Sequence, residues 1–108
     1  MNDRAQEATQ IDRVIHEPAR LAIMSILDGV GEADFLYLMR EAGLSQGNLS
    51  GHLGKLEEAG YVEILKTFKG KYPLTICRLT AKGKESFTEY AQRMIGILKR
   101  GKTLGGAR

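Results

Sequence analysis

The sequence predicts an α+β fold that is mostly α-helical, with a three-helix core, a β-hairpin and one long C-terminal helix. Three observations support it. Before residue 60, apolar residues recur with the 3.6-residue period of helices, and β-branched and aromatic residues fill two short runs between residues 61 and 79. A helical pattern returns after Thr80. Because 108 residues allow only one modest core, we expect a single domain from residue 11 to residue 100.

The N-terminal segment contains a polar stretch followed by the first core helix. Residues 1–10 are polar, and we expect them to be flexible. A short apolar patch at residues 11–15 precedes Pro18, which fits the first turn of a helix because its missing N–H needs no partner there. Residues 21–27, LAIMSIL, are apolar almost all round, which indicates a buried central helix that ends near Gly29.

Two polar residues beside this helix have two interpretations each. Arg20 could contact a phosphate, but an arginine at this position more often holds neighbouring carboxylates or carbonyls. His16 is more often a capping or packing residue than a ligand. We therefore leave both outside the predicted site.

Residues 34–60 are predicted to form two short helices joined by a tight turn. The first helix has one apolar face, made of Phe35, Leu38, Met39 and Ala42. Gly43 ends it, and the hydroxyl of Ser45 can cap the next helix. In the second helix, one apolar stripe is formed by Leu49, Leu53 and Leu56. Only this stripe is committed to the core.

The opposite face of the second helix is unusual because it carries glycines. The residues opposite the leucines are Gly47, Gly51, Gly54 and Glu58, flanked by Asn48, Ser50 and Lys55. Each glycine inside a helix costs about 1 kcal/mol relative to alanine. The pattern has two interpretations: a poorly specified surface helix, or a shallow polar face that enters a DNA major groove about 12 Å wide.

The two runs after residue 60 predict a β-hairpin with a basic tip. Residues 61–69 and 73–79 are the strands, and Gly70 supplies the turn between Lys69 and Lys71. The predicted core face consists of Val62, Ile64, Cys77 and Leu79. The hairpin cations, which include Lys66 and Arg78, could also be solubilising charge that protects an edge strand.

Cys77 is the only cysteine. An internal disulfide and a multi-cysteine zinc site are therefore excluded. We expect Cys77 to be a small core residue rather than a redox sensor, because a sensor thiol should be exposed and close to positive charge.

The last helix is predicted from residue 81 to residue 100, capped by Thr80. Its apolar seam is formed by Phe87, Ala91, Met94 and Leu98. A domain this small does not need so long an apolar helix for its own core, so we predict a dimer interface; the alternative is a helix folded back on its own domain. Residues 101–108 are predicted to be a flexible basic tail.

Composition and charge narrow the function. Hydrophobic content of 43% and charged content of 27% are ordinary for globular proteins. The chain has neither a membrane-spanning apolar run nor a signal peptide, so we expect a cytoplasmic protein. Residues 1–60 hold 5 Lys and Arg against 10 Asp and Glu, whereas residues 61–108 hold 11 against 3. The basic half suggests a polyanionic partner, although a basic solvated surface would look the same.

Together these elements describe a winged helix-turn-helix, and three segments carry a family resemblance. The chain reads HEPARLAI from His16 to Ile23, LSQGNLSGHLGKLEEAGYV from Leu44 to Val62, and PLTICRLTAKG from Pro73 to Gly83. These segments resemble the small one-domain winged-helix transcriptional regulators of prokaryotes related to the MarR and ArsR groups. The resemblance implies a homodimer that binds double-stranded DNA, with the last helix at the dimer interface.

The resemblance also implies which residues contact DNA. It places the recognition helix at the DNA through Ser45, Gln46, Asn48, Ser50 and Gly51; the neighbouring His52 is not assigned. Phosphate contacts would come from Lys55, Lys69 and Lys71. Amides and hydroxyls can read base edges, whereas lysines supply affinity that weakens with salt.

The departures from the family exclude some functions. ArsR-like metal sensors carry paired cysteines before the recognition helix, and this chain has FLYLMRE there, so we expect no metal and no cofactor. No catalytic Cys/His or Ser/His/Asp set is present, so we expect no enzyme. The sequence identifies neither an operator nor a small-molecule effector. The alternative function is a winged-helix protein–protein interaction module.

Overall fold

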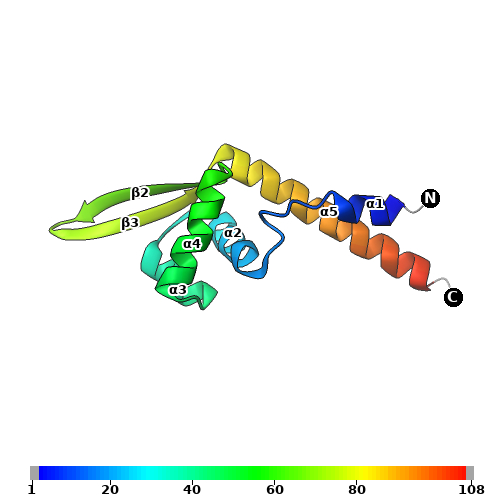
Figure 1. Cartoon of the computed structure of the whole chain (residues 1–108), viewed down its shortest axis with the longest axis horizontal. Coiled ribbons are helices and arrows are strands. Elements are labelled where there is room, and N and C mark those ends of the chain that lie inside the picture. The colour runs from blue at the N-terminus through cyan, green and yellow to red at the C-terminus, as the bar shows by residue number, and fades with distance from the viewer. Residues whose placement is uncertain (1–2, 107–108) are drawn as a thin grey trace.

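The computed structural model describes the backbone of residues 3–106 and the side chains of residues 4–99. The elements in chain order are α1 (Asp3–Thr9), α2 (Pro18–Val30), β1 (Glu32–Asp34), α3 (Phe35–Ala42), α4 (Gln46–Glu58), β2 (Val62–Lys69), β3 (Tyr72–Leu79) and α5 (Ala81–Gly106). A lobe of α2, α3 and α4 lies in the middle, the β2–β3 hairpin projects from one side, and α5 extends to the other (Figure 1). We call this hairpin the wing. The predicted fold class is confirmed.

α2 begins where the sequence predicts. Glu17 caps the helix, its side chain accepting a hydrogen bond from the backbone N–H of Arg20 at 2.8 Å, and Pro18 occupies the first turn. The core residues Ile23, Met24 and Leu27 are fully buried. α2 continues to Val30, one residue beyond the predicted end.

The turn between α3 and α4 is confirmed. Gly43 ends α3 with φ of +66°, a left-handed conformation that glycine adopts without strain. The Ser45 hydroxyl accepts a hydrogen bond from the Asn48 N–H at 3.2 Å and caps α4. The leucine stripe of α4 is almost completely buried, at 0%, 2% and 0% exposure for Leu49, Leu53 and Leu56.

The sheet has three antiparallel strands in the order β1-β3-β2. Ile64 pairs with Cys77 and therefore shares the core face with it, as predicted. The pairs Leu65 with Ile76 and Thr67 with Leu74 share the other face, which the sequence left unassigned. β1 is a strand the sequence did not reveal, because three residues are too few to show alternation.

The two ends of the chain differ from the prediction. Asp3–Thr9 form helix α1, which packs on α5, where a flexible segment was expected (Figure 1). α5 continues to Gly106, so most of the predicted tail is helical; residues 107–108 lie outside the described part. An isolated seven-residue helix is unstable in water. α1 therefore depends on its contact with α5, and the local sequence of α1 does not reveal that contact.

No helix within the described residues combines the length and the apolarity that crossing a membrane requires.

Candidate nucleic-acid interface

The outward face of α4 is open. A Cβ built on Gly47, Gly51 or Gly54 would meet no atom within 4 Å. These glycines are therefore not required by packing inside the chain. They leave a shallow helix surface that another molecule can approach closely.

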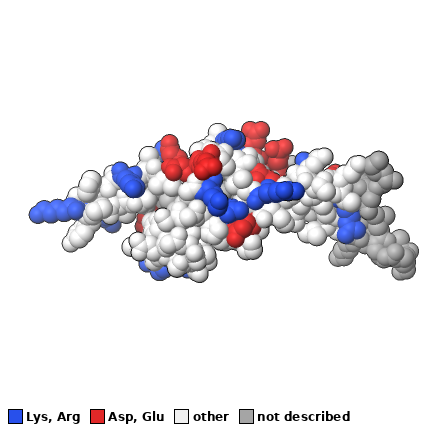
Figure 2. Space-filling view, in the orientation of Figure 1, with Lys and Arg blue, Asp and Glu red and all other residues white. Residues whose placement is uncertain are grey.

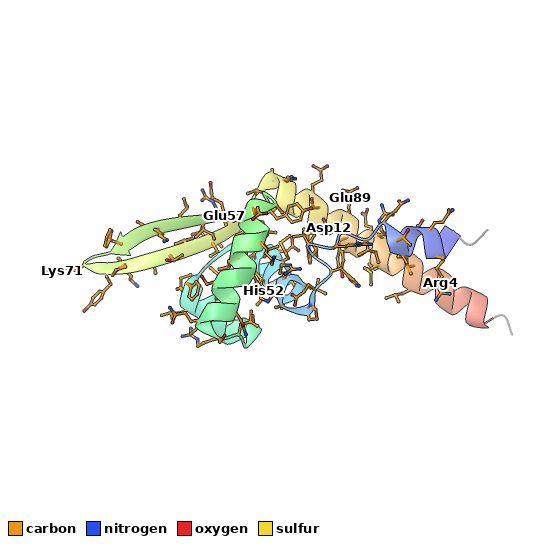
Figure 3. The ribbon with its side chains drawn as sticks, in the orientation of Figure 1. Arg4, Asp12, His52, Glu57, Lys71 and Glu89 are labelled. Carbon is orange, nitrogen blue, oxygen red and sulfur yellow. The ribbon has the colours of Figure 1, made fainter. Side chains whose placement is uncertain are left out.

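One flank of α4 borders a groove of about 1030 Å³ against the wing. Gln46 and Ser50 line it from α4, and Lys66 and Thr75 line it from the two wing strands. Gln46 and Ser50, which the sequence predicts to contact DNA, therefore lie in the same groove as Lys66, which was not among the predicted contacts. Glu57 lines the groove at its other end, near the junction of α4 with β2 (Figure 3).

The other flank of α4 borders a second hollow of about 360 Å³. Three cations line it, from three elements: Arg13 from the α1–α2 connector, Arg20 from α2 and Lys55 from α4. Glu58 contributes the one acidic group among its lining residues. Arg13 was missed because it lies 42 positions before Lys55, and nothing in the local sequence links the two.

Arg20 has a structural role here, in agreement with the interpretation preferred from the sequence. Its Nε donates to the Val14 carbonyl at 2.5 Å, which holds the connector beside Arg13. Its Nη1 lies 3.2 Å from Nδ1 of His52, and that nitrogen lies 3.8 Å from a carboxylate oxygen of Glu17. His52 therefore interacts with α2 and its cap (Figure 3).

Glu17 carries a lowered pKa. The largest cause is the hydrogen bond from the Arg20 backbone N–H; burial opposes the shift, and the charges of His52 and Arg20 assist it. The carboxylate at this cap therefore stays ionised, which suits its position at a helix N-terminus.

The wing carries unpaired positive charge. Arg78 forms an ion pair with Glu63, its Nη2 lying 2.6 Å from Oε1. Lys66, Lys69 and Lys71 are exposed, and within the described residues none of them forms a salt bridge. Lys71 stands at the outer end of the hairpin (Figure 3). These lysines, rather than Arg78, are available to an anion.

Basic groups lie along the wing and beside the middle of α4. Acidic groups lie where α4 meets the wing, over the start of α5 and below the central basic group (Figure 2). The N-terminal half of α4, QGNLSG, carries no charged side chain. Its face thus offers neutral polar groups between two basic borders.

The lobe is joined to α5 by hydrogen bonds. The Asp12 carboxylate accepts from the Val14 N–H at 2.9 Å and from the hydroxyl of Tyr61. His16 Nδ1 lies 2.8 Å from the hydroxyl of Tyr90 on α5. Burial is the largest cause of a raised pKa at both tyrosines. His16 thus has a packing role, as the sequence suggested.

The predicted seam of α5 divides into two parts. Phe87 and Met94 pack partly against the chain's own core, whereas Leu98 is 63% exposed. Ile95, at 55% exposure, lies beside Leu98, and Ala91 is half-buried. The exposed apolar stripe therefore consists of Ile95 and Leu98, with the half-buried Ala91 beside them.

Cys77 is fully buried, as predicted for a core residue. Burial, with smaller contributions from Glu57 and Asp34, raises its pKa to about 11. The thiol is therefore neutral and unreactive near pH 7. Within the described residues, no group of three or more His, Cys, Asp or Glu side chains could hold a metal ion.

Comparison with known proteins places this geometry in context. The family model described as a winged helix DNA-binding domain matches residues 19–98. An uncharacterized protein from Methanocaldococcus jannaschii is 35% identical over 88 residues, covering 81% of this chain and 95% of that protein.

Solved structures show the same fold. A transcriptional regulator homologue from Pyrococcus horikoshii OT3 has a TM-score of 0.82 at 26% identity, covering 87% of this chain and 95% of that one. A MarR-family transcriptional regulator from Silicibacter pomeroyi has a TM-score of 0.64 at 18% identity, covering 92% and 66%.

Proposed function

The chain belongs to the winged helix DNA-binding domain family, and from this premise we propose that it is a homodimeric transcriptional regulator with a preference for particular double-stranded DNA sequences. Its family and fold are those of DNA-binding transcriptional regulators and not of enzymes. The resemblance to small winged-helix transcriptional regulators is confirmed, and a MarR-family regulator shares the fold. Homodimerisation and sequence preference are the proposed parts.

One observation carries the proposal: α4 presents a neutral, glycine-opened face between two basic borders. A helix in the major groove lies between two phosphate backbones. We assign the backbone on the wing side to Lys66, Lys69 and Lys71, and the opposite one to Arg13 and Lys55. These contacts position the protein on DNA but carry no sequence information.

The face between these borders supplies the sequence preference. We assign base contacts to Gln46, Asn48 and Ser50, whose amides and hydroxyl can form hydrogen bonds with base edges. Gly51 lets the helix approach closely, and Ser45 caps the end that enters the groove. The bound dimer would act by occupying a promoter.

The first experiment is a fluorescence-anisotropy titration with random duplex DNA at several salt concentrations. Wild-type binding should weaken steeply with salt, because each neutralised phosphate adds about 0.9 to the slope of log K against log salt. Lys69→Ala with Lys71→Ala should reduce that slope by about 2, and Arg13→Ala by about 1.

The matched control is Lys84→Ala with Lys99→Ala, which removes two exposed lysines from α5. It should leave the slope unchanged. An equal reduction in the control would mean that net charge, and not the wing, sets the salt dependence. A wild-type protein that binds no DNA at low salt would refute the proposal and favour the protein–protein interaction module.

The dimer is tested on the exposed stripe of α5. Each of the two substitutions Ile95→Glu and Leu98→Glu places a charge on the stripe without disturbing the monomer core, so both should yield monomers by sedimentation. Leu36→Glu, at a 60% exposed apolar residue of α3, is the control and should remain dimeric. A dimer that survives both stripe substitutions would show that the interface lies elsewhere.

A further inference from the structure

Two aromatic rings stand at the tip of the wing, and neither has an aromatic or cation–π partner among the described residues. Phe68 is 69% exposed and Tyr72 is 78% exposed, the highest values among the large hydrophobic side chains of the described residues. Both lie at the end of the hairpin farthest from the core (Figure 1). Neither takes part in the ring contacts found within the described chain, which involve His16, Tyr61 and Tyr90.

The strand register places the two rings on opposite faces of the hairpin. Phe68 pairs with Pro73, on the same face as Lys66 and the groove beside α4. Tyr72 pairs with Lys69, on the other face. The tip is therefore flanked by one ring on each side, and Lys69 and Lys71 bracket its turn.

Packing does not require these rings. The turn needs only a residue that tolerates the left-handed φ of +64° at Gly70, and the pairing of the strands near the tip needs no aromatic side chain. The two rings stand together at one end of the hairpin, where both can contact one partner that encloses the tip. From Ile64 to Cys77 the hairpin has three lysines and no acidic residue, which makes a polyanion the complementary partner.

The tip has the reach to contact the groove next to the one that α4 enters. Lys66 still lines the groove against α4, and the strand continues three residues to Lys69, a rise of about 10 Å. The ring of Phe68 or Tyr72 adds several ångströms to that reach. The adjacent minor groove lies half a helical turn away, about 17 Å along the axis.

We propose that the wing tip is a minor-groove wedge. This inference rests on the proposed DNA binding and adds a deformation of the DNA to it. Phe68 and Tyr72 enter between the groove walls, and Lys69 and Lys71 bind the phosphates on either side. Apolar side chains inserted in this way unstack base steps and bend the duplex.

The dimensions explain why the DNA must deform. Packed sheets stand about 10 Å apart, so a hairpin with a ring on each face is about 10 Å thick. The minor groove is about 6 Å wide. The groove must therefore open by about 4 Å, and pyrimidine–purine steps such as TA and CA deform most easily. The wedge thus selects deformable sequences without hydrogen bonds to bases.

The test combines end-to-end energy transfer on dye-labelled duplexes with the anisotropy series in salt. Two duplexes are compared, one with TA steps and one with a stiff A-tract at the wing position. Wild type should shorten the end-to-end distance of the TA duplex and bind it about tenfold more tightly than the A-tract duplex.

Phe68→Ala with Tyr72→Ala should abolish both effects and leave the salt slope unchanged. Phe68→Leu with Tyr72→Leu should restore bending, because leucine is itself an effective wedge. Lys69→Ala with Lys71→Ala should reduce the slope but still bend the DNA once bound. Val30→Ala, at an exposed apolar residue of α2, is the control and should change nothing.

The outcomes separate this inference from the proposed function. Wild-type binding with a steep salt slope but no change in end-to-end distance would overturn the wedge alone. A double alanine variant that bends DNA as wild type does would do the same. Absence of any wild-type binding would overturn both proposals. A thermal melt of each variant confirms that the exposed substitutions leave the fold intact.

Discussion

The glycines of α4 and Gly83 of α5 occupy helices for opposite reasons. An added Cβ at Gly51 or Gly54 meets nothing within 4 Å, whereas at Gly83 it would lie 2.0 Å from the carbonyl oxygen of Tyr61. Both kinds of glycine weaken a helix by about the same amount. At Gly83 the absence of a Cβ allows a close contact with the backbone of Tyr61, and this contact stabilises the fold. On α4 no contact within the chain uses the missing side chains, and we propose that the open face serves the bound DNA.

The contact at Gly83 is part of the joint between the lobe and α5. The Thr80 N–H donates to the Tyr61 carbonyl at 3.0 Å, and the Thr80 hydroxyl donates to the Gly60 carbonyl at 2.6 Å. The same hydroxyl accepts from the Gly83 N–H at 2.9 Å and caps α5, as predicted. The first turn of α5 therefore lies directly on the backbone at Tyr61, and only glycine fits there.

Gly83→Ala should give the largest effect. The Cβ would collide with backbone that cannot move without breaking the joint, so the free energy of unfolding should fall by about 3 kcal/mol or more. Urea unfolding measures it. Gly96→Ala, in the same helix with nothing within 4 Å of the added Cβ, is the control. A Gly83→Ala protein as stable as wild type would contradict the contrast between the two kinds of glycine.

Tyr61→Phe tests the same joint between the lobe and α5, with a smaller expected loss of stability. The variant loses the hydrogen bond to the Asp12 carboxylate, so the free energy of unfolding at pH 7 should fall by about 1.5 kcal/mol. Because the pKa of Tyr61 is raised, the stability that its protonated hydroxyl contributes is fully present below pH 10. That stability is lost as the pH rises through the raised pKa. Wild type should therefore lose more stability than the variant in urea melts above pH 10. If wild type and Tyr61→Phe lost equal stability above pH 10, the alkaline sensitivity would arise from another group, for example Tyr90.

Gly51→Ala should give the smallest effect on stability, with the opposite sign. The helix gains up to about 1 kcal/mol because alanine is a better helix former and the site is open. DNA binding should weaken, because the new methyl group stands on the face that we propose enters the groove. Gly96→Ala should gain similar stability without a loss of DNA binding. A Gly51→Ala variant that binds DNA as well as wild type would mean that this face does not approach DNA closely.

Local sequence signals explain most of what was predicted. Pro18, Gly43, Ser45, Gly70 and Thr80 each mark a boundary through their own backbone or capping chemistry, and the structure places the corresponding boundaries there or within one or two residues. The leucine stripe of α4 is specified by spacing alone. Features without a local signal were missed: α1 is polar and short, and β1 has three residues.

The candidate site was predictable to a similar extent. Gln46 and Ser50 line the groove beside the wing, and both were in the predicted set. They were predictable because the buried leucine stripe of α4 determines which side chains face outward. Lys66 and Arg13 were not in that set. Each becomes a neighbour of α4 only when the sheet and the α1–α2 connector fold against it.

The sequence by itself determined every element except α1 and β1, the order of those elements, the buried face of α4 and the basic character of the wing, because periodicity, capping and charge are properties of neighbouring residues. The tertiary structure decided which charges remain unpaired, which glycine is required and which part of α5 stays exposed. Arg78 is paired because β2 and β3 align it with Glu63, and Gly83 is required because Tyr61 lies above it. Such facts depend on distances between residues far apart in the chain, which only the folded structure sets.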